Sequence, residues 1–259
     1  MINYFYMGEA MDEENNQFYV VINGMDLTGK STLVNSLAKN CKQKNVEVLR
    51  SSFLKNNPLN VLARDLRKER EVGQVNQETI CKLYKFAESE DPILLKLLRE
   101  QLPQISDEVL GHLYADAIAK ELEFFKPTTS IIHDSSTIIK TLAIHRGLNL
   151  GDSLLKKIEK LMLSHPKPTK PEYSILLEAS IDVKKDRLNK RINEGGYVSE
   201  IDKKVFSEPH KVEKTAEAMR EITLKMFPET LVIDTTNMSE KEVFVTANKQ
   251  LKICKDRSL

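Results

Sequence analysis

The stretch Phe18–Thr32, with the sequence FYVVINGMDLTGKST, constrains the fold of this chain more than any other. It opens with the unbroken apolar run Tyr19-Val20-Val21-Ile22, and Gly24 follows shortly after. A short, β-branched run of this kind is typical of a parallel strand that is buried on both faces. After the stretch, Leu33, Val34 and Leu37 recur on one helical face. The sequence therefore predicts a strand, a glycine loop and a helix in immediate succession.

The loop between this strand and this helix has the spacing G-x-x-x-x-G-K-S of a P-loop. Its glycines let backbone N–H groups turn toward phosphate oxygens, and the positive dipole end of the following helix faces the same anion. Lys30 is predicted to reach the β- and γ-phosphates, and Ser31 to ligate Mg²⁺. A chance glycine turn is the alternative, but the order of elements favours a P-loop. The predicted ATP-binding residues here are Gly24, Met25, Asp26, Leu27, Thr28, Gly29, Lys30, Ser31 and Thr32.

Composition limits the remaining function classes. The 259 residues, 41% of them hydrophobic, suffice for one α/β domain with an inserted segment. The net charge of +1 provides no overall field for nucleic acid or an anionic membrane. Three cysteines without CxxC spacing are expected to be reduced in a cytoplasmic protein. No apolar run is long enough to span a bilayer, and residues 1–17 are too acidic for a signal peptide and are expected to form a flexible lead.

Residues 18–259 are expected to form a single domain in which strands and helices alternate. Between the second and third strands, helical periodicity predicts a helical insertion over about residues 59–126, where a kinase of this architecture would close over its acceptor. Besides the P-loop strand, strands are predicted at Val46–Arg50, Ser130–Asp134, Ser174–Glu178 and Thr230–Asp234. Outside the insertion, helices are predicted over 148–164, from a cap at Asp182 through Arg191, over 203–227, and from Ser239 onward.

Three of these strands end in an acid, at Asp134, Glu178 and Asp234. A strand-terminal acid beside the P-loop strand is where a Walker B residue holds the Mg²⁺ of a bound nucleotide. Position alone does not choose among the three.

A basic segment late in the chain is predicted to form a lid. Five cations fall within Lys184–Arg191, and Gly195 and Gly196 follow them. A basic segment with a glycine hinge suits a lid, at about residues 187–204, that closes on phosphates and excludes water. A solvated basic helix end is the alternative.

The order of elements and the segments GMDLTGKST, VLRSSF, HLYADA, IIHDSS, KPEYSILLEASIDVKKDRLNKR and LVIDTT together resemble thymidylate kinase and its nucleoside monophosphate and deoxynucleoside kinase relatives. The resemblance covers about residues 18–251, and the stretch 70–105 is longer than the family usually has. It implies a P-loop three-layer sandwich with a five-stranded parallel sheet of order 2-3-1-4-5 and helices on both faces. It also implies ATP and Mg²⁺ as the phosphoryl donor, a nucleotide or nucleoside acceptor, and a homodimer.

On the donor side, the resemblance implies that Lys30 and the loop amides bind the ATP phosphates. Asp134 matches the acid of the family's DR motif, which makes it a predicted Mg²⁺ ligand together with Ser31. The remaining implied residues are Arg187 and Arg191, where lid cations stabilise the transferring phosphoryl group, and Thr236, near the loop that borders adenine.

On the acceptor side, Asp26 matches the P-loop acid that faces the acceptor sugar. Arg50 matches the arginine that grips the acceptor phosphate, and Tyr114 sits where an aromatic ring stacks on the acceptor base. The last two have structural alternatives, an ion pair with a nearby acid for Arg50 and a place in the core for Tyr114. The predicted catalytic residues are Lys30, Asp26, Arg187 and Arg191.

The chain departs from the family at two acceptor-side arginines. The DR motif reads Asp134-Ser135, and Ala117-Ile118 stands where another arginine is expected. Loss of two charge-assisted contacts, each contributing roughly 1.5–3 kcal/mol, predicts weak thymidylate kinase activity and an acceptor with less charge or a different shape. Whether Lys140, Arg146 or a lid cation takes over stays open.

Three functions are consistent with the sequence. The first is a nucleotide or nucleoside kinase, and the second is a P-loop kinase for another small hydroxyl compound on the same scaffold. The third is an ATP-binding module without catalysis, whose acceptor site has decayed. Turnover with any acceptor would exclude the third.

Overall fold

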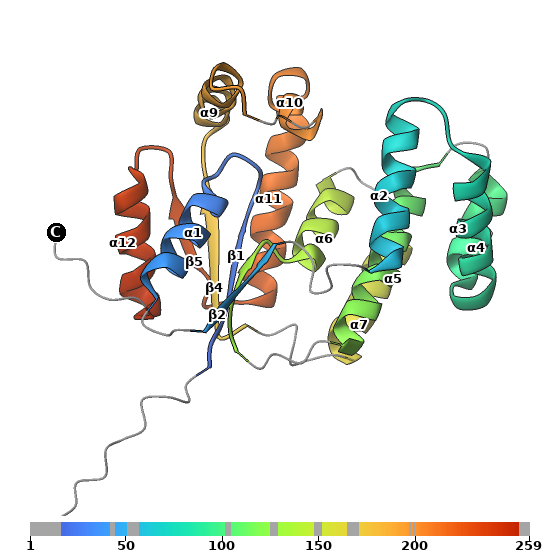
Figure 1. Ribbon diagram of the computed structural model, residues 1–259, viewed down its shortest axis with the longest axis horizontal. Coiled ribbons are helices and arrows are strands. Elements are labelled where there is room, and N and C mark those ends of the chain that lie inside the picture. The colour runs from blue at the N-terminus through green and yellow to red at the C-terminus, as the bar shows by residue number, and fades with distance from the viewer. Residues whose placement is uncertain are drawn as a thin grey trace, which may run out of the picture.

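Five parallel strands form one sheet in the order β2-β3-β1-β4-β5, which confirms the predicted strand order (Figure 1). The computed structural model describes residues 17–41, 45–50, 57–101, 105–124, 129–147, 152–164, 171–196, 198 and 200–253. The predicted N-terminal lead, apart from Gln17, lies outside these residues. The central strand is hydrogen-bonded on both sides, so its apolar run is buried as the sequence indicates. The strands are β1 (Tyr19–Gly24), β2 (Val46–Arg50), β3 (Ser130–Asp134), β4 (Tyr173–Glu178) and β5 (Leu231–Asp234).

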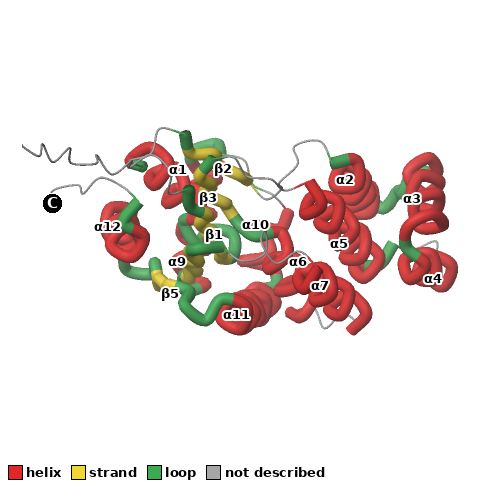
Figure 2. The backbone as a smooth tube through the Cα atoms, turned by 90° about the horizontal axis from the view of Figure 1, so that it is seen from below, coloured by secondary structure: helices red, strands yellow, loops and turns green. Residues whose placement is uncertain are grey.

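Helices cover both faces of the sheet (Figures 1 and 2). Successive strand residues alternate between the two sides, because Ile175 and Leu177 pack with the helices of one face while Leu176 packs with those of the other. Each fully buried aliphatic side chain contributes about 1.5–3 kcal/mol to folding. One face carries α1 (Lys30–Asn40) and α12 (Glu240–Leu251), and the other carries α6 (Thr137–Gly147) and α11 (Pro209–Met226).

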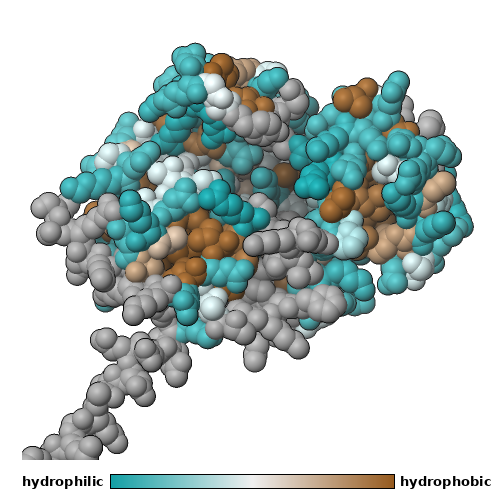
Figure 3. Space-filling view, viewed as in Figure 1, coloured by the Kyte–Doolittle hydropathy of each residue, from teal (hydrophilic) through white to brown (hydrophobic). Residues whose placement is uncertain are grey.

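The described helices between β2 and β3 form a bundle, which we call the helical lobe together with the later helix α7 (Figure 2). The lobe has a hydrophobic core of its own, to which Leu66, Leu83, Leu94 and Leu113 contribute. In the space-filling view, the surface is recessed between the sheet and the lobe (Figure 3). The lobe consists of α2 (Pro58–Glu71), α3 (Gln77–Glu90), α4 (Pro92–Gln101), α5 (Asp107–Phe124) and α7 (Asp152–Ser164).

Several predicted helix boundaries are wrong for identifiable reasons. The single helix expected over 203–227 is two helices, α10 (Glu200–Ser207) and α11, because Pro209 lacks the N–H that a continuous helix needs. Residues 137–147 form α6, a helix that the sequence analysis did not predict. The helix expected over 148–164 corresponds to α7 (Asp152–Ser164), and residues 148–151 lie outside the described residues.

The helix after β4 is α9 (Ile181–Asn193). Its cap is Ser180, whose hydroxyl accepts a hydrogen bond from the Val183 N–H, while the predicted cap Asp182 lies in the first turn. Helices α9 and α10 lie together above the carboxyl ends of the strands (Figure 1). The predicted lid therefore corresponds to the end of α9 and the start of α10. Among the described helices, none is long and apolar enough to cross a bilayer.

Candidate functional site

The loop after β1 has the backbone of a phosphate cradle. Gly24 adopts a φ of 148°, and a Cβ atom there would lie 2.5 Å from the Leu177 carbonyl oxygen. Gly29 adopts a φ of 94° as the N-cap of α1, and no side chain caps this helix. The first N–H groups of α1 are therefore left for a ligand, and the helix dipole favours an anion there.

Lys30 lies buried at the start of α1, beneath this loop. Its Nζ atom donates a hydrogen bond to the Met25 carbonyl oxygen at 2.7 Å and lies 3.9 Å from the Asp26 carboxylate. Burial lowers the pKa of Lys30 to about 8, although Asp26 opposes the shift. A buried ammonium group with so little compensating charge favours an anionic ligand.

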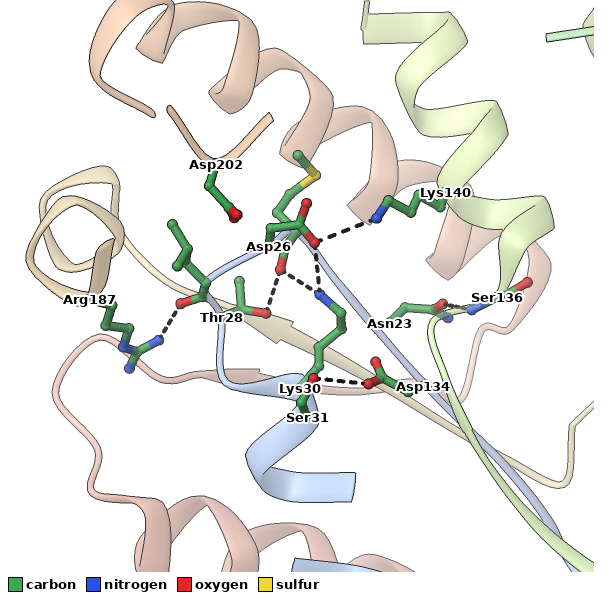
Figure 4. A network of polar contacts seen from close by, with 12 residues as sticks. Asn23, Asp26, Thr28, Lys30, Ser31, Asp134, Ser136, Lys140, Arg187 and Asp202 are labelled. Atoms are coloured by element: carbon green, nitrogen blue, oxygen red, sulfur yellow. Dashed lines mark hydrogen bonds and ion pairs between the residues drawn. The ribbon is translucent and has the colours of Figure 1, made fainter. Parts of the chain in front are cut away.

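The hydroxyl of Ser31 donates a hydrogen bond to the Asp134 carboxylate at 3.0 Å (Figure 4). The other two strand-terminal acids have different partners, because Glu178 forms an ion pair with Arg220 and Asp234 accepts a hydrogen bond from the Thr236 hydroxyl at 2.6 Å. No group of three or more His, Cys, Asp or Glu that could hold a metal occurs in the described part of the chain. Two oxygen ligands fit Mg²⁺, which keeps several waters and also binds substrate phosphates.

The Asp26 carboxylate lies between two ammonium groups (Figure 4). One of its oxygens is 3.9 Å from Lys30 Nζ and 3.5 Å from Lys140 Nζ. Burial alone would raise the pKa of Asp26, but the charges of Lys140 and Lys30 outweigh it and hold the pKa below its usual value. The sequence analysis left the part of Lys140 open, and the structure places it on α6 beside the P-loop.

Arg187 contacts the P-loop from α9. Its guanidinium donates to the Leu27 carbonyl at 2.9 Å and to the Thr235 carbonyl at 3.0 Å. The buried Thr235 hydroxyl in turn donates to the carbonyls of Glu178 and Thr28, at 2.9 and 3.2 Å. Arg187 therefore ties the P-loop to the loop after β5. Sequence reasoning missed Thr235, because a single threonine after a strand carries no signal of a contact with a distant loop.

The other predicted lid and adenine-side residues lie around this contact. Arg191 is 3.5 Å from the buried Asp202 of α10, so it joins the two helices above the strand ends. The Thr236 hydroxyl accepts a hydrogen bond from the Ser180 N–H at 3.0 Å, which places it beside the start of α9. All three predicted residues, Arg187, Arg191 and Thr236, thus lie at the carboxyl edge of the sheet.

The two predicted acceptor-side residues outside the P-loop lie on β2 and α5. Arg50 ends β2 in register with Asp134, and its exposed guanidinium donates to Asn35 of α1 at 2.9 Å. Tyr114 is half-buried on α5 and packs against the core of the helical lobe. Arg50 therefore lies at the strand ends beside Asp134, whereas Tyr114 packs within the helical lobe.

Comparison with known proteins gives structural likeness without sequence likeness. No protein-family model and no curated protein sequence matches the chain. A thymidylate kinase from Candida albicans superposes with a TM-score of 0.54 at 14% identity, covering 91% of each chain. A deoxyadenosine kinase from M. mycoides, solved with bound dCTP, superposes with a TM-score of 0.51 at 14% identity, covering 90% of this chain and 99% of that one. The chain therefore has a thymidylate kinase-like P-loop kinase fold.

Proposed function

We propose that this protein is an ATP-dependent kinase that transfers a phosphoryl group to a nucleotide or nucleoside acceptor, on a phosphate oxygen of the nucleotide or a hydroxyl of the nucleoside. The observation that carries the proposal is the arrangement of Lys30, Ser31 and Asp134 around the loop that ends β1. It joins a buried cation to a pair of oxygen ligands beside an uncapped helix N-terminus. The choice of a nucleotide or nucleoside over another hydroxyl compound is supported by analogy of fold.

In the proposed reaction, the acceptor oxygen bonds to the γ-phosphorus as the bond from that phosphorus to the bridging oxygen of ADP breaks. The products are ADP and the phosphorylated acceptor, together with one proton where the acceptor group is a hydroxyl. Catalysis of this reaction depends on positioning and on stabilisation of charge. The loop amides and Lys30 would hold the donor phosphates, and Arg191 would add charge from above. Arg187 would keep the P-loop in place through the Leu27 carbonyl.

Ser31 and Asp134 fit the donor set of Mg²⁺, since their oxygens lie 3.0 Å apart, with Ser31 in the first turn of α1 and Asp134 at the end of β3. Held there, the ion would supply neutralisation of charge on the phosphate oxygens.

The binding half of the proposal is tested with Lys30→Met. The variant is expected to fold, because Lys30 Nζ bonds only to the Met25 carbonyl and lies near Asp26. Its affinity for ATP should fall about 10- to 100-fold, as expected for loss of a contact of roughly 1.5–3 kcal/mol with a charged group. Lys39→Met, which removes an exposed lysine of the same helix, is the matched control. Unchanged ATP affinity in Lys30→Met, measured by titration calorimetry, would show that the loop is only structural.

The catalytic half is tested by ATP consumption with deoxynucleoside monophosphates, nucleosides and unrelated alcohols. Turnover with nucleotides or nucleosides supports the proposal. Turnover with an unrelated alcohol alone would identify a kinase for another small hydroxyl compound. ATP binding without turnover on any acceptor would favour a non-catalytic ATP-binding module.

A further inference from the structure

The two positions at which the sequence lacks an expected arginine are closed to the acceptor. Ser135 follows β3 with a φ of 74° and is only 4% exposed. Ala117 and Ile118 are 0% and 2% exposed, and Ile118 packs between α5 and α6. None of these side chains offers a charge to a ligand in the recess beside the P-loop. Any acceptor-side cation must therefore come from elsewhere.

Lys140 is a cation that contacts Asp26, the acidic residue of the P-loop. It belongs to α6, the helix that lies between the sheet and the helical lobe (Figure 2). Its Nζ atom is 3.5 Å from Asp26, and the two side chains are 35% and 34% exposed, so a ligand has access to both. Figure 4 shows Lys140 approaching Asp26 from the side opposite Arg187.

Nearby cations are engaged elsewhere. Arg146, one and a half turns further along α6, lies 3.1 Å from Glu221 of α11. Lys157 lies within 2.6 Å of carboxylates inside the helical lobe. Arg191 pairs with Asp202 above the strand ends. Of these candidates, the geometry selects Lys140.

We propose that Lys140 is the cation that holds the Asp26 carboxylate in position on the acceptor side of this site, and that the pair selects an uncharged hydroxyl acceptor over a phosphate monoester. The proposal rests on the proposed kinase function and names its acceptor class. Asp26 accepts a hydrogen bond from the acceptor hydroxyl and receives its proton as the oxygen bonds to the γ-phosphorus.

The charges of Lys140 and Asp26 favour an uncharged acceptor over a phosphate monoester. Lys140 and Asp26 together are neutral, and Lys30, which lies 3.9 Å from Asp26, would be neutralised by the donor phosphates once ATP is bound. A phosphate monoester would carry nearly two negative charges next to Asp26 and would compete with that carboxylate for one ammonium group. The negative charges of the phosphate and of Asp26 would repel each other. An uncharged hydroxyl is not repelled by Asp26. It can donate a hydrogen bond to the Asp26 carboxylate, which Lys140 already holds in place.

The experiment compares acceptor pairs that differ only in the phosphate, thymidine with dTMP and deoxyadenosine with dAMP. The wild-type protein should have the higher kcat/KM for the nucleoside of each pair. Lys140→Met should lower kcat for nucleosides about 100-fold, the cost of a misplaced catalytic group, with little change in ATP affinity. Lys140→Arg should restore much of the loss. Arg146→Met, which removes the other cation described on α6, should behave as wild type.

Three outcomes would overturn the proposal. Preference for the monophosphates, with Lys140→Met raising their KM selectively, would make Lys140 a phosphate ligand. If Lys140→Met has the same kinetics as the control Arg146→Met, the contact between Asp26 and Lys140 has no role in the reaction. Equal binding of both members of each pair, in the presence of a non-hydrolysable ATP analogue, would refute the acceptor class. Failure of the wild-type protein to bind the analogue would instead refute the proposed function, so the two failures are distinguishable.

Discussion

A buried ion cluster in the helical lobe makes stability depend on pH. Lys157 of α7 lies 2.6 Å from Asp91, which precedes α4, and 2.5 Å from Asp116 of α5. His112 Nδ1 is 3.8 Å from the same oxygen of Asp91. With both carboxylates ionised, two negative charges face one lysine. Burial raises the pKa of Asp116 to about 7, and Asp91 adds to this while Lys157 opposes it.

The size of the effect follows from linkage. The pKa of Asp116 rises from 3.8 in the unfolded chain to about 7 in the folded one, so the folded state keeps a proton that the unfolded state has released. The stability due to neutral Asp116 is therefore complete below about pH 4 and is lost as the pH rises through 7. A shift of about 3 units corresponds to about 4 kcal/mol. Between pH 5 and 7 the loss is about 2 kcal/mol.

Asp116→Asn tests this reasoning, because the amide has nearly the same shape and does not ionise. Urea unfolding at pH 5 and pH 8 should show the variant gaining on the wild type by about 3 kcal/mol between the two. Glu123→Gln is the control, since it neutralises an exposed acid of the same helix. A difference between variant and wild type that is equal at both pH values, or larger at pH 5, would refute the assignment of a protonated Asp116.

Two further predictions concern the site. Ser31→Ala and Asp134→Asn should each raise the Mg²⁺ concentration needed for half-maximal activity, because each removes one oxygen of the proposed metal site; an unchanged Mg²⁺ titration would contradict this. Asp26→Ala and Arg50→Ala should lower kcat/KM for the acceptor while ATP affinity measured by calorimetry changes little, since both side chains lie outside the glycine cradle. Equal loss of ATP affinity in both variants would place them on the donor side.

The sheet was predictable because its signals are local. Each strand is a short apolar run with a polar or glycine end, and the resemblance supplied their order. The P-loop was predictable because Gly24 and Gly29 satisfy backbone requirements that few other residues meet. What sequence could not supply was the pairing of distant side chains. Three strands end in acids, and position alone does not choose among them. The resemblance pointed to Asp134, and the tertiary contact with Ser31 places that acid beside the P-loop.

The unpredicted helix α6 shows why the acceptor side was harder to predict than the donor side. Its segment TIIKTLAIHRG is buried against the sheet on one side and the lobe on another, with Ile138, Ile139, Leu142 and Ala143 all in the core. A helix covered on several sides has no polar stripe from which to recognise a helical period. The sequence therefore could not predict in which direction its one lysine, Lys140, points. The structure places α6 between the sheet and the lobe, and from there Lys140 points at Asp26 (Figure 4). The choice of acceptor can therefore be tested at this pair of residues.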